Sequence, residues 1–151
     1  MIYYDLDGVL FDFTGHFYKY LGLPDHEPVI WDDPRIREHF HLIETDHEFW
    51  LTIPAYTNKL PYPPLGYVTT RPVPSWVSAE ALWKAGFDYA PVYTGRDKTA
   101  YIPKGSVMVD DAAHNFEELT AAGVKCYLLD KAYNQHVETD MRIYNLDEIK
   151  L

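Results

Sequence analysis

The chain has 151 residues, a formal net charge of −10 and a single cysteine, Cys126. This length supports one domain with a proper hydrophobic core and leaves no room for a second full domain. The acidic balance disfavours broad nucleic-acid binding, and a lone thiol excludes both an internal disulfide and a zinc site built on several cysteines.

Hydrophobic residues make up 47% of the chain and charged residues 24%, the balance of a folded globular protein. No apolar run is long enough to span a bilayer, so we expect no membrane partner. The first residues lack a basic region followed by an apolar one, which is the pattern of a secretory signal. The expected compartment is therefore the cytoplasm.

Five short runs rich in β-branched or aromatic residues predict strands. They are residues 2–4, 66–69, 106–109, 124–129 and 142–144. Helical stretches lie between the later runs, at 75–85 and 112–122, with a shorter one at 98–101. Gly86 and Gly123 follow the two longer stretches, where a left-handed helix cap uses glycine. This alternation predicts an α/β, three-layer, Rossmann-like fold with a central parallel sheet.

Residues 12–64 interrupt the alternation. They hold aromatic and acidic residues in an irregular helical pattern and end in the stiff run Leu60-Pro61-Tyr62-Pro63-Pro64. We expect a small, mainly helical cap inserted after the first strand, with residues 1–11 and 65–151 forming the core of a single domain. The plain alternative is that each aromatic ring there only packs between helices.

Polar residues gather where three of the predicted strands end. Asp5 follows the first run, Thr69 closes the second, and the pair Asp110-Asp111 closes the third. In open parallel sheets, functional groups collect beyond the carboxyl ends of the strands. We therefore expect the site at this edge of the sheet.

Asp5 and Asp7 lie two residues apart, and Gly8 lets the chain turn sharply behind them. Both carboxylates can then face one point and bind a cation. The same spacing opens a calcium-binding loop, but such a loop needs an acidic twelfth residue. His16 stands at that position, so a calcium loop is disfavoured.

Four short motifs together resemble the haloacid dehalogenase-like (HAD) superfamily, whose motifs close successive strands. They are Asp5-Leu6-Asp7-Gly8-Val9-Leu10 after an apolar strand, Tyr67-Val68-Thr69, Lys98 at the start of a helix, and Val107-Met108-Val109-Asp110-Asp111. The motifs follow the order found in that family and span most of the chain. Any one of them alone would be common by chance.

The resemblance implies a phosphomonoesterase that works through an aspartyl-phosphate. Asp5 would attack phosphorus, and Asp7 would protonate the leaving oxygen and then activate water. The second acid distinguishes phosphatases of this kind from the dehalogenases, which lack it. Thr69 would donate a hydrogen bond to a phosphoryl oxygen, and Lys98 would neutralise charge in the transition state.

The cofactor that the resemblance implies is Mg²⁺, which prefers oxygen ligands. Asp5, the backbone carbonyl of Asp7 and a carboxylate of the pair Asp110-Asp111 would hold it. The motif leaves open which member of that pair binds directly. His39, His41 and His47 suggest another metal site, but residues two apart on a helix do not share a face, and solvated or packed imidazoles explain them better.

Several of these assignments have plain alternatives. A strand threonine such as Thr69 is usually structural, and Lys84 and Lys104 compete with Lys98. Lys98 is favoured because its spacing to the fourth motif allows one helix and a turn. Arg71 would contact phosphate or substrate with its planar fork, or else pair with a surface carboxylate.

Three looser matches resemble small 5′(3′)-deoxyribonucleotidase-like proteins of bacteria and phages: residues 48–54, 68–72 and 128–134. They imply a nucleoside monophosphate as the small phosphorylated substrate, with Trp50, Thr70 and Arg71 as substrate-binding residues. An aromatic cap suits a flat base, because rings stack and exclude water. Other small phosphomonoesters would suit it nearly as well.

Three other classes compete with a nucleotidase. A receiver domain also combines acids, Thr and Lys around Mg²⁺, but its acidic pair comes at the first strand, whereas Asp110-Asp111 comes late. A non-catalytic binding module could retain the same site, although every proposed catalytic residue type is present. A phosphatase acting on nucleic-acid ends is disfavoured by the negative charge.

Overall fold

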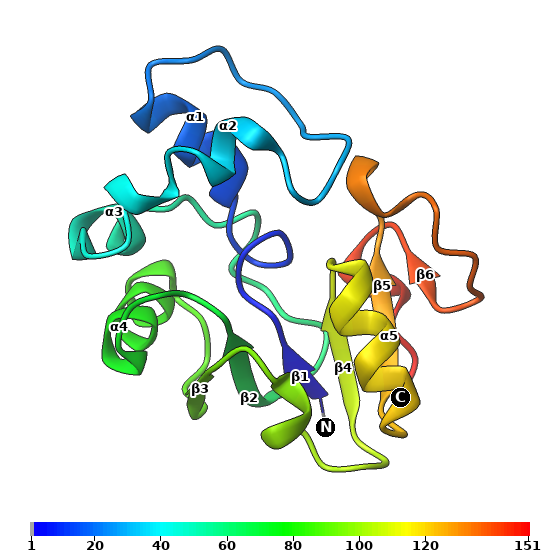
Figure 1. The fold of residues 1–151 in the computed structure, drawn as a ribbon. Coiled ribbons are helices and arrows are strands. Elements are labelled where there is room, and N and C mark those ends of the chain that lie inside the picture. The colour runs from blue at the N-terminus through cyan, green and yellow to red at the C-terminus, as the bar shows by residue number, and fades with distance from the viewer. Residues whose placement is uncertain (1) are drawn as a thin grey trace.

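A computed structural model describes residues 2–151, which form one sheet with helices on both of its faces (Figure 1). All six strands are parallel and lie in the order β3-β2-β1-β4-β5-β6. They are β1 (Ile2–Tyr4), β2 (Pro64–Thr69), β3 (Val92–Thr94), β4 (Val107–Asp110), β5 (Lys125–Leu129) and β6 (Arg142–Ile143). The predicted three-layer α/β fold is confirmed.

Side chains of successive strand residues pack into separate apolar clusters. Tyr4, Tyr67 and Val109 belong to one cluster, together with Val77 and Leu82 of helix α4 (Ser75–Ala85). Their strand neighbours, such as Tyr3, Val68 and Met108, belong to the other cluster, which also holds Phe116 and Leu119 of helix α5 (Ala113–Ala121). Alternate residues of a strand point to opposite faces, so the sheet is buried on both sides.

The two long helices agree closely with the sequence prediction. Helix α4 ends at Gly86, whose φ of 87° is left-handed, as expected for a glycine cap. Helix α5 is capped by Ala122, and Gly123 follows with a φ of 84°. The stretch 98–101 forms only the short 3₁₀ helix η2 (Lys98–Ala100). Asp97 caps its N-terminus, and the Asp97 side chain accepts from the backbone N–H of Thr99.

Strand β3 was not predicted from the sequence. It has only three residues, it lies at the edge of the sheet, and its side chains are half-buried, so its pattern is weak. Its pairing with β2 aligns Val92 with Tyr67 and Thr94 with Thr69.

The segment between β1 and β2 carries four short helices and lies beyond the carboxyl end of β1 (Figure 1). They are α1 (Phe13–Tyr20), α2 (Pro34–Arg37), η1 (Phe40–Leu42) and α3 (His47–Leu51). Phe13 stacks on Trp50 with ring centroids 5.5 Å apart, and Phe49 meets Phe17 edge to face. The aromatic residues of this segment therefore pack largely against one another, and its function as a cap stays a prediction.

The remaining 3₁₀ helices follow β5 and β6: η3 (Ala132–Asn134) and η4 (Leu146–Glu148). Among residues 2–151, no helix has both the length and the apolar character needed to cross a membrane.

Candidate active site

The order of the strands brings the predicted acids together. After β1 the chain adds β2 and β3 on one side, and after β4 it continues with β5 and β6 on the other. The direction of winding therefore reverses between β1 and β4, where sites in such sheets are found. Asp5 follows β1, Asp110 ends β4 and Asp111 comes next, and these three offer carboxylate oxygens within 4.8 Å of one another.

Lys98 reaches this cluster from η2. Its Nζ lies 2.8 Å from Oδ1 of Asp5 and 2.7 Å from Oδ2 of Asp110, and its side chain is buried. Burial alone would lower the pKa of Lys98, but the charges of Asp110 and Asp5 outweigh it and raise the pKa above its ordinary value. The lysine therefore stays charged and bridges two of the three acids.

Lys84, one of the two competing lysines, lies elsewhere. It is half-exposed on α4 and forms an ion pair with Glu80, at 3.6 Å. Lys104 packs its side chain beside Gly123 and is exposed. Of these three lysines, only Lys98 belongs to the acid cluster.

Both carboxylate oxygens of Asp110 are engaged within the protein. Oδ1 accepts from the backbone N–H of Ala112 at 2.9 Å, and Oδ2 accepts from Lys98. The amide Nδ2 of Asn115 lies 3.3 Å from Oδ2 as well. Asp110 is therefore saturated by protein donors.

Asp111 is bound differently. Its Oδ2 accepts a hydrogen bond from the hydroxyl of Tyr133, while its Oδ1 is buried and without a partner in the described residues. Burial and the nearby charge of Asp110 raise the pKa of Asp111 to about 6. The same two causes raise the pKa of Asp5 well above its usual range.

These contacts show a local shortage of positive charge. Three buried acids share one ammonium group, and burying an incompletely compensated carboxylate is costly. The donor set is all oxygen, which suits Mg²⁺, and the unpartnered Oδ1 of Asp111 is the kind of atom a metal ion would satisfy. The residues present therefore fit a divalent cation held by Asp5 and Asp111.

Gly8 allows the acid-bearing loop to come this close to Asp111. Its φ is 83°, and a Cβ built on it would collide with the carboxylate of Asp111. The turn itself is fixed by the N–H groups of Leu10 and Phe11, which both donate to the carbonyl of Leu6. A side chain at position 8 would therefore both strain the backbone and displace an acid.

Asp7 turns away from the cluster and pairs with Arg71. The guanidinium donates through Nε to Oδ2 at 2.9 Å and through Nη2 to Oδ1 at 2.8 Å, a bidentate arrangement. The side chain of Arg71 is fully buried, and its guanidinium carbon lies over the rings of Phe11 and Trp50, 4.9 and 5.3 Å from their centroids. The predicted alternatives for Arg71 were substrate or a surface carboxylate, and its partner is the second acid of the first motif.

Thr69 is buried at the end of β2, and its Oγ1 accepts from the backbone N–H of Arg71 at 3.2 Å. This bond fixes the loop that leads to the arginine. Thr70 is exposed and lines the neighbouring pocket. The phosphate contact expected of Thr69 stays a prediction.

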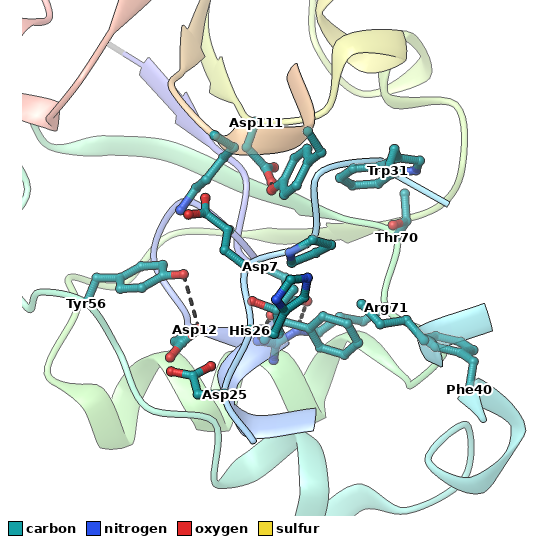
Figure 2. Close-up of a pocket in the computed structure, with 18 of the residues that line it drawn as sticks. Asp7, Asp12, Asp25, His26, Trp31, Phe40, Tyr56, Thr70, Arg71 and Asp111 are labelled. Atoms are coloured by element: carbon teal, nitrogen blue, oxygen red, sulfur yellow. Dashed lines mark hydrogen bonds and ion pairs between the residues drawn. The ribbon is translucent and has the colours of Figure 1, made fainter. Parts of the chain in front are cut away.

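A pocket of about 490 Å³ opens beside these residues (Figure 2). One part of its wall comes from the site loops, with Asp7, Gly8, Arg71 and Asp111. Another part is aromatic, formed by Phe13, Trp31, Phe40, Trp50, Tyr56 and Tyr133. Such a wall, next to a few polar groups, is typical of a small-molecule site.

Trp50 contributes to this wall mainly as a core residue. It is 2% exposed, and its indole N–H donates to the carbonyl of Ile43 at 2.9 Å. Trp31 is the more accessible ring, at 53% exposed, and it contacts both His114 and Tyr133 edge to face, with centroids 5.2 Å away from each.

Sequence reasoning missed several site residues. Tyr133 and Asn134 lie in the segment 128–134 that resembled nucleotidases, but that resemblance assigned them no role. Asn115, in the first turn of α5, could have been suspected only from its nearness to the fourth motif. The three suspected histidines stay outside the acid cluster; His39 binds the carbonyl of Arg35 at 2.8 Å.

A parallel sheet in this order, with acids at its point of reversal, defines a Rossmann-like α/β protein with a candidate cation site. The structure is similar to a solved hydrolase of the haloacid dehalogenase-like family, SP0104 from Streptococcus pneumoniae. The TM-score is 0.53 at 14% sequence identity, over 89% of this chain and 86% of that one. At this identity the likeness establishes the fold. No protein-family model and no curated protein sequence matches the chain.

Proposed function

We propose that the chain is a Mg²⁺-dependent phosphomonoesterase of the haloacid dehalogenase type, with Asp5 as its nucleophile. One observation carries this proposal: three buried carboxylates converge at the reversal point of the sheet with a single ammonium group between two of them. A cluster of this composition with only a structural role would cost folding free energy, because its buried carboxylates are incompletely compensated. A bound cation would compensate them and could in turn bind a phosphate group.

The chemistry follows from the positions of the two aspartates. Oxygen of Asp5 attacks phosphorus, the bond to the leaving oxygen breaks, and that oxygen takes a proton from Asp7. In the second step Asp7 removes a proton from water, whose oxygen attacks the aspartyl-phosphate and frees Asp5 and inorganic phosphate. In the structure both carboxylate oxygens of Asp7 accept from Arg71. The first step requires this pair to loosen when substrate is bound.

Other residues stabilise charge during these steps. Lys98 holds Asp5 and would compensate charge on the phosphoryl oxygens, and Thr69 would donate to one of them. Held by Asp5 and Asp111, Mg²⁺ would supply charge compensation for the phosphoryl group. Of the acidic pair, Asp111 is the better ligand, because both oxygens of Asp110 are already occupied.

For the substrate we propose a nucleoside monophosphate, as in 5′(3′)-deoxyribonucleotidase-like enzymes. The pocket is large enough for a base and sugar beside the acids, and its aromatic wall would stack on the base. Trp31, Tyr56 and Thr70 are among the accessible residues there, while the buried ring of Trp50 packs behind the wall. Another small phosphomonoester is the alternative substrate.

The strand order argues against the signalling alternative. Receiver domains of the flavodoxin-like type have the order 2-1-3-4-5. This sheet has the order 3-2-1-4-5-6, with β1 between β2 and β4. The acid cluster of this chain therefore lies on a sheet whose strand order differs from that of a receiver domain.

The test is phosphate release from a panel of deoxyribonucleoside, ribonucleoside and sugar monophosphates, with Mg²⁺ or with chelator. We expect turnover only with Mg²⁺, and a loss of at least a thousandfold in Asp5→Asn. Asp88→Asn, an exposed acid away from the cluster, is the matched control and should keep full activity. Full activity in Asp5→Asn, or no turnover of any substrate, would refute the proposal.

A further inference from the structure

Asp111 is the least firmly compensated acid of the cluster, and two adjacent residues hold it. Tyr133 donates its hydroxyl to Oδ2 of Asp111, and Asn134 donates Nδ2 to the backbone carbonyl of the same residue at 2.9 Å. Both belong to η3, which follows β5, the strand that pairs with β4. One short helix therefore fixes both the side chain and the backbone of Asp111.

Residues of β5 and β6 in turn hold η3 in place. Asn134 is fully buried, and its Nδ2 also donates to the carbonyl of Leu129 at 2.8 Å, the last residue of β5. Arg142 of β6 donates to Oδ1 of Asn134 at 2.7 Å and to its carbonyl at 2.9 Å. Arg142 also donates to Oδ1 of Asp130 at 2.8 Å. The position of η3 is thus set by two strands.

The hydrogen bond of Tyr133 selects which oxygen of Asp111 is free. With Oδ2 occupied by the hydroxyl, only Oδ1 is left, and it is buried without a hydrogen-bond partner among residues 2–151. A neutral donor stabilises the ionised form of a carboxylate and fixes its rotation about the Cβ–Cγ bond. A carboxylate that binds a metal ion needs both the ionised form and a fixed orientation.

We infer that Tyr133 is a positioning residue for the metal ligand Asp111: its hydroxyl orients the carboxylate so that Oδ1 faces the cation. The inference rests on the proposed function, because it requires Mg²⁺ at the acid cluster. Groups that orient ligands in this way contribute to metal affinity, and their removal typically weakens it by about 10–100-fold.

The experiment measures Mg²⁺ binding directly. Thermal midpoints of the full chain are recorded over a series of MgCl₂ concentrations at constant ionic strength, and the half-saturating Mg²⁺ concentration is obtained from the rise. For Tyr133→Phe we expect this concentration to increase by about 10-fold or more. The ring and its pocket contacts remain in this variant.

Tyr67→Phe is the matched control. Tyr67 is also buried, and its hydroxyl donates to a carbonyl, that of Asp88 at 2.7 Å, with no contact to the acid cluster. The control should lose stability as Tyr133→Phe does, yet keep the wild-type Mg²⁺ concentration. Equal half-saturation in wild type, Tyr133→Phe and the control would overturn the inference while leaving the proposed function intact.

Two further outcomes are decisive. Absence of any Mg²⁺-induced rise in the wild type would overturn the metal site and the inference together. If Tyr133→Phe does not fold, Tyr133→Leu, which also lacks the donor, is titrated in its place with the same expectation. Failure of both variants to fold even in saturating Mg²⁺ would show a structural residue and would also overturn the inference.

Discussion

Replacing Asp111 by Asn tests whether the acid cluster is overcharged without a cation. In chelator at pH 7.5, we expect Asp111→Asn to be more stable than the wild type. Burial and the charge of Asp110 raise the pKa of Asp111 from 3.8 to about 6. One pKa unit corresponds to about 1.36 kcal/mol, so ionised Asp111 costs about 3 kcal/mol of folding free energy at that pH.

This energy has a definite pH dependence. A carboxyl group whose folded pKa is raised stabilises the protein fully below its unfolded pKa, and this contribution is lost as the pH rises through the folded value. The difference between Asp111→Asn and wild type should therefore be largest above pH 7 and shrink as the pH falls from about 6 towards 4. The amide of Asn still offers an oxygen to the Tyr133 hydroxyl, so that bond does not confuse the comparison.

The assay is thermal unfolding in chelator and in Mg²⁺, at several pH values. For a chain of this length, about 3 kcal/mol corresponds to a midpoint shift of roughly 6–12 °C. Mg²⁺ should raise the midpoint of wild type and have little effect on Asp111→Asn, which reverses their order. If Asp111→Asn is less stable than wild type in chelator at every pH, the inference that the acid cluster carries uncompensated negative charge is wrong.

Three further predictions concern other residues. Asp7→Asn should be less stable than wild type by about 2–3 kcal/mol in urea unfolding, because the buried Arg71 loses a charged bidentate partner; unchanged stability would mean that the pair contributes little. Trp31→Ala should raise KM for nucleoside monophosphates more than for a non-aromatic sugar phosphate, since its ring lines the pocket; equal changes would argue against stacking. Cys126 should react with a thiol reagent only after unfolding, because burial excludes the reagent and raises the thiol pKa well above its ordinary value; rapid reaction of the native protein would contradict its placement.

Much of the sheet and the position of the site could be predicted, because they depend on local sequence patterns. The strands that lead to Asp5, Thr69 and Asp110 are short apolar runs. Because sites form at the carboxyl ends of parallel strands, these three residues are expected to lie at one edge of the sheet. Lys98 could be chosen from spacing alone. Gly86 marked the end of α4 because its φ suits few other residues.

The pairings that shape the site could not be predicted, because they join distant parts of the chain. Arg71 and Asp7 are separated by 64 residues, and Tyr133 and Asp111 by 22. Nothing in either neighbourhood specifies the partner, since an arginine after a strand and a tyrosine after an aspartate are both common. These contacts become visible only when the register and order of the strands are known.

Strand β1 has consequences for how the chain acquires its shape during synthesis. It has only three residues, all of them buried, and its two neighbours are β2 and β4. A strand this short has no stability of its own, and it must wait for partners that the ribosome makes about 60 and 105 residues later. Asp5 is thus translated before Lys98 and Asp111, and the acid cluster is completed only after Asp111 has emerged. An unfinished chain holds Asp5 without the rest of its site.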